Sequence, residues 1–456
     1  MVAETMRRSL QSDGVQQLSF EGQLVFDINT FWLVFGSMIV FYMQAGFALL
    51  EAGTVRVKNV KNILVKNLMD ACLSALVWWA IGHPLASGPN PYLDPTPLSG
   101  VGRAFGATNF FIEDTAVAAL QDPASGSFYA SWLFSWSFAA TSSTIVSGAV
   151  AERCRFNAYI LYTVLMTGVI YPVGAFWHAQ GWFNDGIRDG YSFIDFAGSG
   201  TVHMVGGVAA LVGSYFLGPR SGRFKVDGTV VPFVASSSML QALGVLILWF
   251  AWYGFNCVST GALVGLGGVA AYVAVNTTLS AAAGGVFSLI IAIMGGNDAE
   301  LPPLLNGVLS GLVAVTASAH AVKTWAAFVI GLAAGGIYHL GVWALLRLRI
   351  DDPLDAVPVH GFCGLWGVIA AGLFSTHTPG NNTVKGAFYG DGAQLGVQIA
   401  GALALLAWVA VCCILLFGFL RKVNLLRVPY EEEVAGLDMK HGGQAFRQVA
   451  SKQHVA

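Results

Sequence analysis

The sequence predicts an all-α protein that crosses a membrane many times. Of its 456 residues, 55% are hydrophobic and only 11% are charged, whereas a soluble domain carries about 25% charged residues. The apolar residues gather in runs long enough for an α-helix to span a bilayer. The 55 glycines favour helices that pack closely together. The net charge of −2 gives no sign of nucleic-acid binding.

Eleven apolar runs divide the chain. They cover residues 30–52, 68–88, 127–150, 157–182, 195–218, 232–256, 262–294, 304–320, 325–347, 355–374 and 393–420. An odd number of spans places the two termini on opposite sides of the membrane. We therefore expect a polar leader over residues 1–29, a membrane domain over 30–420 and a tail over 421–456. No signal peptide is expected, since the leader lacks an apolar core.

The distribution of Lys and Arg predicts the orientation. Basic residues are concentrated in the connections on the side of the tail, including Arg56, Lys58, Lys61 and Lys66 after the first span. The opposite connections carry Arg103, Arg188, Lys323 and Lys385. Because cytoplasmic loops are richer in Lys and Arg, we expect an extracellular N-terminus and a cytoplasmic tail in the cell membrane.

Two histidines occupy matching places in the pattern. His203 lies in "VHMVGG" of span 5 and His360 in "VHGFCG" of span 10, each after Val and four residues before Gly. The chain then divides into two five-span halves, about 30–220 and 230–375, plus a long eleventh helix. Five is odd, so the second half enters from the opposite side, as in inverted-repeat transporters. A chance match of this short motif is the alternative.

An ionisable residue inside the membrane indicates function, because burying it in hydrocarbon is costly. A single His is often a packing residue that donates to a carbonyl. A pair can share one N–H and suits a small polar substrate or a proton relay. A metal site is the rival interpretation, but neither helix supplies the further ligands that it needs. We therefore expect no metal and no cofactor.

Other polar and aromatic residues surround these spans. Asp195, eight residues before His203, is placed to cap span 5 or to shape a cation site. Phe138 and Phe255 lie among small polar residues, where a ring can close a passage. Trp177 lies at the outer end of span 4, as an interface anchor or as a cation–π site.

Six segments in order carry a family resemblance: "MQAGFALLEAGTVRVKNVKNIL", "GAVAERCRF", "DFAGSGTVHMVGG", "WYGFN", "DDPLDAVPVHG" and "VPYEEEVAGLDMKHGG". Through them the chain resembles the ammonium transporter family, the Amt/MEP/Rh superfamily, and within it the Amt branch. The resemblance implies eleven helices per subunit, a 5+5 inverted repeat and a homotrimer with one pore per subunit. It also implies that the family's tail reaches a neighbouring subunit.

The resemblance also implies residue roles. His203 and His360 match the twin pore histidines, and Phe138 and Phe255 match the stacked gate. Trp177, Phe138 and Ser259 match the outer ammonium site. Asp195 matches the acid below that site, and Thr316 matches a threonine that lines the pathway.

The chain departs from the family pattern in three places. "FWHAQGW" is about two residues short, so counting back from Trp182 assigns Trp177 to the outer site, whereas counting forward from Tyr171 assigns Ala179. Lys323 places a cation beside the outer mouth. "LDMKHGG" lacks the Thr that plant-type tails phosphorylate.

We expect an ammonium transporter that deprotonates NH4+ and conducts NH3, with net charge movement. The alternatives are an electroneutral Rh-like NH3 channel and an ammonium sensor that signals through its tail. An enzyme is not expected, because no nucleophile–base pair is readable. Asn381, in "NNT" of an outer loop, is a candidate glycan acceptor.

Overall fold

The computed structural model describes residues 19–87, 106, 110–112, 123–185, 187–188, 190–296, 298–377 and 385–441. In these residues the regular structure is helical apart from isolated β-bridges, which confirms the predicted all-α class. Asn381 and the first 18 residues lie outside the described part of the chain.

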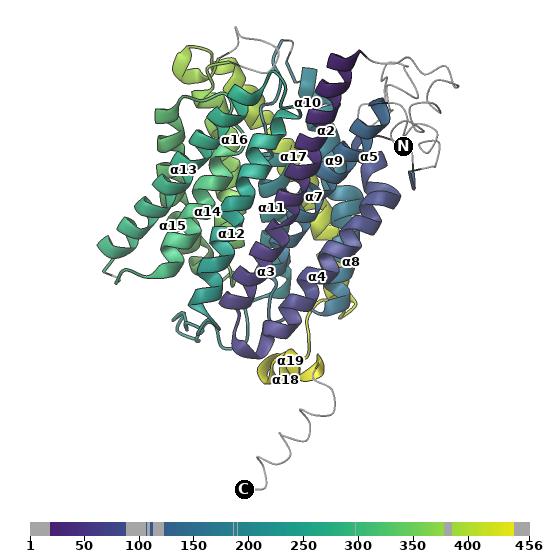
Figure 1. Cartoon of the computed structure of the whole chain (residues 1–456). Coiled ribbons are helices and arrows are strands. Elements are labelled where there is room, and N and C mark those ends of the chain that lie inside the picture. The colour runs from purple at the N-terminus through teal and green to yellow at the C-terminus, as the bar shows by residue number, and fades with distance from the viewer. Residues whose placement is uncertain are drawn as a thin grey trace.

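A helical segment lies at each of the eleven predicted spans (Figure 1). The first five are α2–α3 (Phe20–Phe41, Met43–Thr54), α4–η2–α5 (Val60–Val77, Trp78–Gly82, His83–Ser87), α7 (Pro123–Ala149), α8–η4–α9 (Phe156–Leu165, Met166–Ile170, Tyr171–Ala179) and η5–α11 (Ser199–Met204, Val205–Leu217). The next five are α12 (Ser238–Cys257), α13 (Gly267–Met294), α14 (Leu301–Val315), α15 (Thr324–Arg347) and η7–α16 (Val357–Phe362, Cys363–Phe374). The last is α17 (Gly392–Lys422).

Short helices occupy the connections and the tail. They are η1 (Val57–Asn59), α10 (Trp182–Asp185), η6 (Val258–Thr260), η8 (Ala387–Tyr389), α18 (Tyr430–Ala435) and α19 (Asp438–His441). Among the described residues, nine helical segments are long and apolar enough to cross a membrane. Of the other two spans, α14 has only 15 residues, and the Ser and Thr residues of α7 lower its mean hydropathy.

Two helices begin eight or more residues before the apolar runs that predict them. The first begins at Phe20, where the Ser19 hydroxyl accepts the Gly22 N–H at 3.1 Å and caps the helix. The second is already helical at Val60, so the prediction that Lys66 lies in an inner connection is wrong. Lys66 is buried inside α4 with 0% exposure. A hydropathy run stops at such polar residues although neighbouring helices cover them.

The two halves repeat the same packing. α3 and α12, which belong to the first span of each half, contact each other. The third span of each half contacts the first, second and fifth spans of its own half: α7 packs on α2, α4 and α11, and α14 packs on α12, α13 and α16. This shared pattern is what the predicted 5+5 repeat requires.

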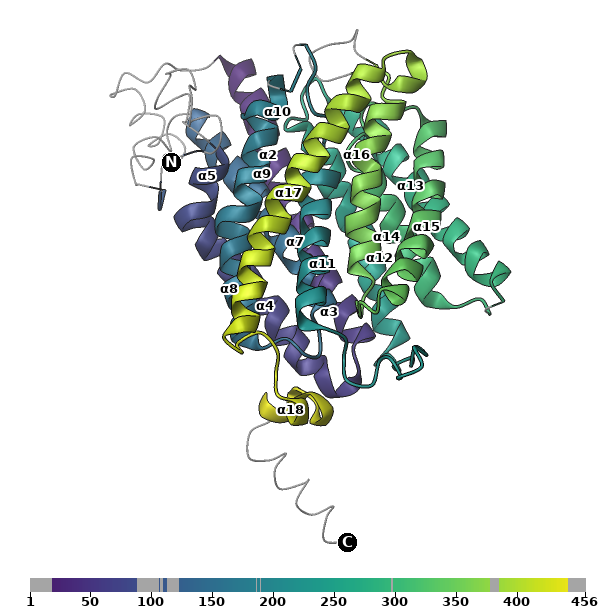
Figure 2. The same ribbon diagram turned by 180° about the vertical axis from the view of Figure 1, so that it is seen from behind.

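The eleventh helix joins the halves and leads to the tail. α17 runs obliquely across the back of the bundle (Figure 2) and contacts α11 and α16, one helix of each half. It ends at Lys422, two residues beyond the predicted span. The tail helices α18 and α19 lie under the end of the bundle opposite α10 (Figure 1).

Candidate functional site

The two histidines meet inside the bundle. The Nδ1 atoms of His203 and His360 lie 3.2 Å apart, and their ring centroids are 5.3 Å apart with an angle of 23° between the planes. Both side chains are buried. Each residue belongs to a π-helical turn, η5 or η7, at the start of its span. Such turns occur often at functional sites, and here they occupy the same place in both halves.

Each π-helical turn is capped by an aspartate eight residues before its histidine. The Asp195 carboxylate accepts the backbone N–H of Gly200 at 3.0 Å and of Thr201 at 2.7 Å. Asp352 accepts the N–H of Val357 at 2.7 Å, five residues on, as Gly200 is from Asp195. Asp352 was missed from the sequence, although the shared Asp-to-His spacing could have shown it.

The contact between the Nδ1 atoms determines what the pair offers. One Nδ1 must donate its hydrogen and the other must accept it. The donor ring then carries a bare Nε2 that accepts, and the acceptor ring carries an Nε2–H that donates. The Nε2 atom of His203 is buried and has no hydrogen-bond partner within the described structure. The pair therefore presents unused hydrogen-bonding capacity inside an apolar bundle.

Two stacked phenylalanine rings lie on one side of the histidine pair. The centroids of Phe138 and Phe255 are 4.0 Å apart, with 17° between the ring planes. Phe255 lies 5.4 Å from the ring of His203, and Phe134 packs on Phe138 at 4.7 Å. The stack fills the approach to the histidines from the end of the bundle that holds Ser259.

Trp252 is a further site residue that the sequence did not single out. Its ring stacks on His203, with centroids 5.0 Å apart and 17° between the planes. Its Nε1–H donates to the Thr316 hydroxyl at 2.9 Å. Thr316 thus orients the indole that supports His203. The sequence could have indicated this role, because Trp252 lies three residues before Phe255 and residues at that spacing share a helix face.

The structure brings together only part of the predicted outer site. The Ser259 hydroxyl donates to the carbonyl of Phe255 at 2.8 Å, so it adjoins the stack. The ring of Trp177 lies 5.6 Å from that of Trp182 and 5.8 Å from that of Trp408. In the described part of the chain, no hydrogen bond or ring contact joins Trp177 to Phe138 or Ser259.

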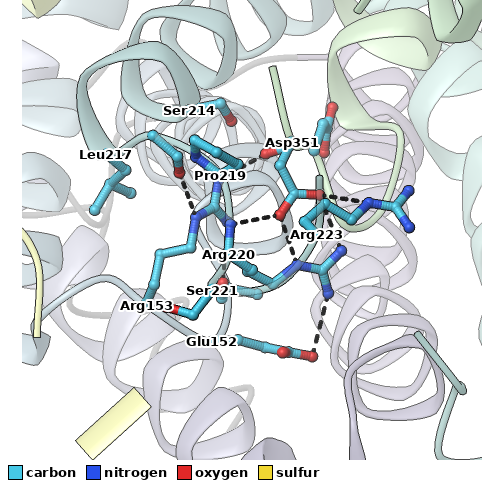
Figure 3. A network of polar contacts seen from close by, with 12 residues as sticks. Glu152, Arg153, Ser214, Leu217, Pro219, Arg220, Ser221, Arg223 and Asp351 are labelled. Atoms are coloured by element: carbon cyan, nitrogen blue, oxygen red, sulfur yellow. Dashed lines mark hydrogen bonds and ion pairs between the residues drawn. The ribbon is translucent and has the colours of Figure 1, made fainter. Parts of the chain in front are cut away.

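An ion-pair network gathers around Asp351 (Figure 3). Arg220 donates to both oxygens of Asp351, at 2.7 and 3.0 Å, and its Nη1 lies 3.4 Å from Glu152. Arg223 approaches the same aspartate at 3.3 Å. Burial raises the pKa of Asp351, but hydrogen bonds and the charges of Arg220 and Arg153 outweigh burial and hold it well below its usual range. The network joins the connection after α11 to the segment that leads into η7.

Among the side chains that the structure describes, no group of three or more His, Cys, Asp or Glu residues is placed to hold an ion. Within the described structure the histidine pair offers two nitrogen ligands, fewer than the three or four protein ligands of a zinc site.

These features define a class of protein. Eleven spans, two halves with matching contacts and a buried polar pair behind an aromatic stack are the attributes of a polytopic membrane transporter. The family model described as "Ammonium Transporter Family" matches residues 31–446. The chain belongs to the ammonium transporter family.

Individual relatives agree with this assignment. The chain is 36% identical to ammonium transporter 3 of Dictyostelium discoideum, over 96% of this chain and 98% of that protein. It is 37% identical to the ammonium transporter Amt2 of Archaeoglobus fulgidus, over 92% and 88% of the two chains. Among solved structures, a "Sensor Amt Protein" matches with a TM-score of 0.81 and 31% identity, over 92% of this chain and all of that one. Mep2 of Candida albicans matches with a TM-score of 0.76 and 28% identity, over 89% and 87% of the chains.

Proposed function

We propose that this protein transports ammonium by recruiting NH4+ outside the Phe138–Phe255 stack, removing a proton there and conducting NH3 past His203 and His360. The proton moves inward as well, so transport is electrogenic. The observation that carries the proposal is the buried histidine pair next to the stack, with the two Nδ1 atoms 3.2 Å apart.

Desolvation is the reason for deprotonation. A buried cation without a partner loses many kcal/mol of hydration, and in the described structure no carboxylate adjoins the histidine pair. Neutral NH3 avoids this cost and needs only one or two hydrogen-bond partners. The unpartnered Nε2 of His203 supplies one, and the shared Nδ1 hydrogen gives the pair a route for a proton.

The proposed outer site uses ring faces and one hydroxyl. Ser259 already donates its hydrogen to the Phe255 carbonyl, so its oxygen lone pairs are free to accept an N–H of NH4+. The rings of Phe138 and Trp177 would add cation–π attraction, worth about 0.5–2 kcal/mol each. Trp177 lies in a separate aromatic cluster with Trp182 and Trp408. We therefore propose that Trp177 acts at the mouth rather than in contact with Ser259.

The test is a current measurement across a membrane that contains the protein. External NH4+ is stepped while NH3 is held constant by adjusting pH. We expect a saturable inward current that falls in His203→Ala and in Trp177→Leu. His339→Ala and Trp343→Leu are matched controls, because His339 is hydrogen-bonded to Ser288 and Trp343 is 59% exposed on the bundle surface.

The other outcomes identify the rival functions. Ammonia-dependent pH change without current would contradict electrogenic transport and indicate an electroneutral channel. Absence of both signals, with ammonium still stabilising the purified protein, would indicate a sensor. The similarity to a protein titled "Sensor Amt Protein" favours sensing as the second candidate.

We also propose a homotrimer in the cell membrane with an extracellular N-terminus and a cytoplasmic tail. Arg56, Arg153, Arg220 and Arg223 support this orientation, because they gather at the end of the bundle where the tail lies. Native mass spectrometry tests the trimer, and a protease added to sealed cells tests the tail. A monomer, or a tail cleaved from outside, would contradict the respective proposal.

A further inference from the structure

A second group of buried polar side chains lies between α3, α4, α7 and α8. It contains three ionisable residues, Glu51, Lys66 and Asp70, each at most 1% exposed. α7 contacts α4 on one side and α11, the helix that follows His203, on another. The group is thus beside the proposed pathway rather than in it, and nothing in the transport mechanism uses it.

In two of the three ionisable groups, every charged atom has at least one partner. One Glu51 oxygen accepts from the Ser147 hydroxyl, and the other accepts from the Asn67 amide at 2.8 Å. The Lys66 ammonium donates to the Cys154 carbonyl at 3.0 Å and lies 5.9 Å from the centroid of the Tyr159 ring.

Asp70 is only half satisfied. Its Oδ1 accepts from the hydroxyls of Ser143, at 2.8 Å, and Thr163, at 2.5 Å. Its Oδ2 is buried and has no partner within the described residues, and the same holds for the hydroxyl of Tyr159, which faces this carboxylate from α8. A buried polar atom left unpaired costs about 1–3 kcal/mol. Two such oxygens beside each other can be joined by the phenol hydrogen or by one cation that binds between them.

The charge balance points to a cation. Two carboxylates face one ammonium. The Arg153 guanidinium also lies near Lys66, but it donates to the Asp351 carbonyl at 2.6 Å and belongs to the network around that aspartate. Tyr159, Tyr162 and Cys154 are neutral when protonated. With both carboxylates ionised, the group carries one uncompensated negative charge away from water, which is strongly unfavourable. One added monovalent cation removes that charge.

We propose that Asp70 is the centre of a binding site for one monovalent cation, a proton or Na+, which bridges Asp70 Oδ2 and the Tyr159 hydroxyl. A proton would sit on Oδ2 and be donated to the phenol oxygen. A sodium ion would use the carboxylate, the phenol oxygen and the hydroxyls of Ser143 and Thr163, the oxygen ligands that hard cations prefer. Either cation joins α4 to α8 and α7, so its binding stabilises the first half of the bundle.

The experiment compares the unfolding temperature of the purified full chain with that of Asp70→Asn. Asparagine mimics the protonated acid and cannot hold Na+ by charge. Both proteins are titrated with pH in sodium-free buffer, and with NaCl replacing choline chloride at constant ionic strength and alkaline pH. Asp27→Asn on α2 is the control, because Asp27 is an exposed acid on another helix.

If the bound cation is a proton, the unfolding temperature of the parent should fall more than that of Asp70→Asn as pH rises. NaCl should then leave the unfolding temperatures of both proteins unchanged. For sodium, NaCl raises the unfolding temperature of the parent and not that of the variant. Identical pH and NaCl dependence in the parent and in Asp70→Asn would overturn the proposal. His203→Ala should keep the dependence of the parent, which separates this site from the pore.

If Asp70→Asn does not fold, Tyr159→Phe takes its place in the experiment. Tyr159→Phe keeps the carboxylate and removes only the phenol oxygen from the site. We expect a weaker cation dependence than in the parent, and an unchanged dependence would again overturn the proposal.

Discussion

Gly207, four residues after His203, lies directly against the backbone of Gly361, the residue that follows His360. A Cβ atom at position 207 would be 2.1 Å from the Gly361 nitrogen. The relation is reciprocal, because a Cβ at Gly364, four residues after His360, would be 2.8 Å from the nitrogen of Met204. The glycine in each V-H-x-x-x-G motif is therefore what allows the other histidine's helix to approach.

Gly207→Ala should abolish transport. The methyl group cannot fit against backbone atoms, so the two helices must separate and the histidine rings lose their 3.2 Å contact. Ammonium-dependent current measures the effect. Gly396→Ala on α17 is the control, because a Cβ there meets nothing within 4 Å and Ala favours helix. Normal current in Gly207→Ala would contradict this account of the motif.

Thr316→Val should impair the support of His203. The change removes the acceptor of the Trp252 indole N–H, and a buried donor left unpaired costs about 1–3 kcal/mol. We expect a lower unfolding temperature and a smaller current. Thr316→Ser keeps the hydroxyl and should restore both. If Thr316→Val and Thr316→Ser have the same unfolding temperature and current, the Thr316 hydroxyl does not support His203.

Asp351→Asn should destabilise the end of the bundle where the tail lies. Arg220 would keep its charge in a nearly buried site without its main partner (Figure 3), and such a loss costs about 3–5 kcal/mol. The unfolding temperature of the purified protein measures it. Asp227→Asn removes an exposed acid from the same connection after α11 and should change stability by less than about 0.5 kcal/mol. Equal effects of the two changes would refute the importance of the network.

Asp352 should make stability depend on pH. Burial, reinforced by the charge of Asp355, raises its pKa to about 7, from about 3.9 in the unfolded chain. The folded protein therefore holds a proton that the unfolded chain has released. This contribution to stability is full below pH about 4 and is lost as pH rises to about 7. Unfolding temperatures over this range should fall less steeply in Asp352→Asn than in the parent, and parallel curves would exclude Asp352 as the titrating group.

The tail should hold the neighbouring connections between the spans in place. One Glu433 oxygen accepts the Ser221 N–H at 2.6 Å, and the other accepts from Arg427 at 2.8 Å. We expect Glu433→Gln to reduce transport, because the neutral amide has one acceptor oxygen where the carboxylate has two. Glu431→Gln, on the exposed side of α18, is the matched control. Deleting residues 428–456 without any loss of transport would show that the tail has no role in the activity.

The sequence alone determined the number of spans, the halves and the residues of the central pair. Membrane helices must bury about 20 apolar residues each, so composition marks them directly. Ionisable residues are rare in such runs, so His203 and His360 stand out. The spacing from Asp352 to His360 was also readable, because it repeats the spacing from Asp195 to His203.

Only the tertiary structure decided which side chains meet. Trp252 stacks on His203 because α12 is turned toward the pair, and Trp177 joins Trp408 because α17 crosses behind α9. Lys66 lies just before a hydropathy run and Asp70 lies within it, yet the connection after α7 and α7 itself supply them with hydrogen-bond partners. Helix rotation and crossing depend on packing between residues far apart in the chain, which no local pattern records.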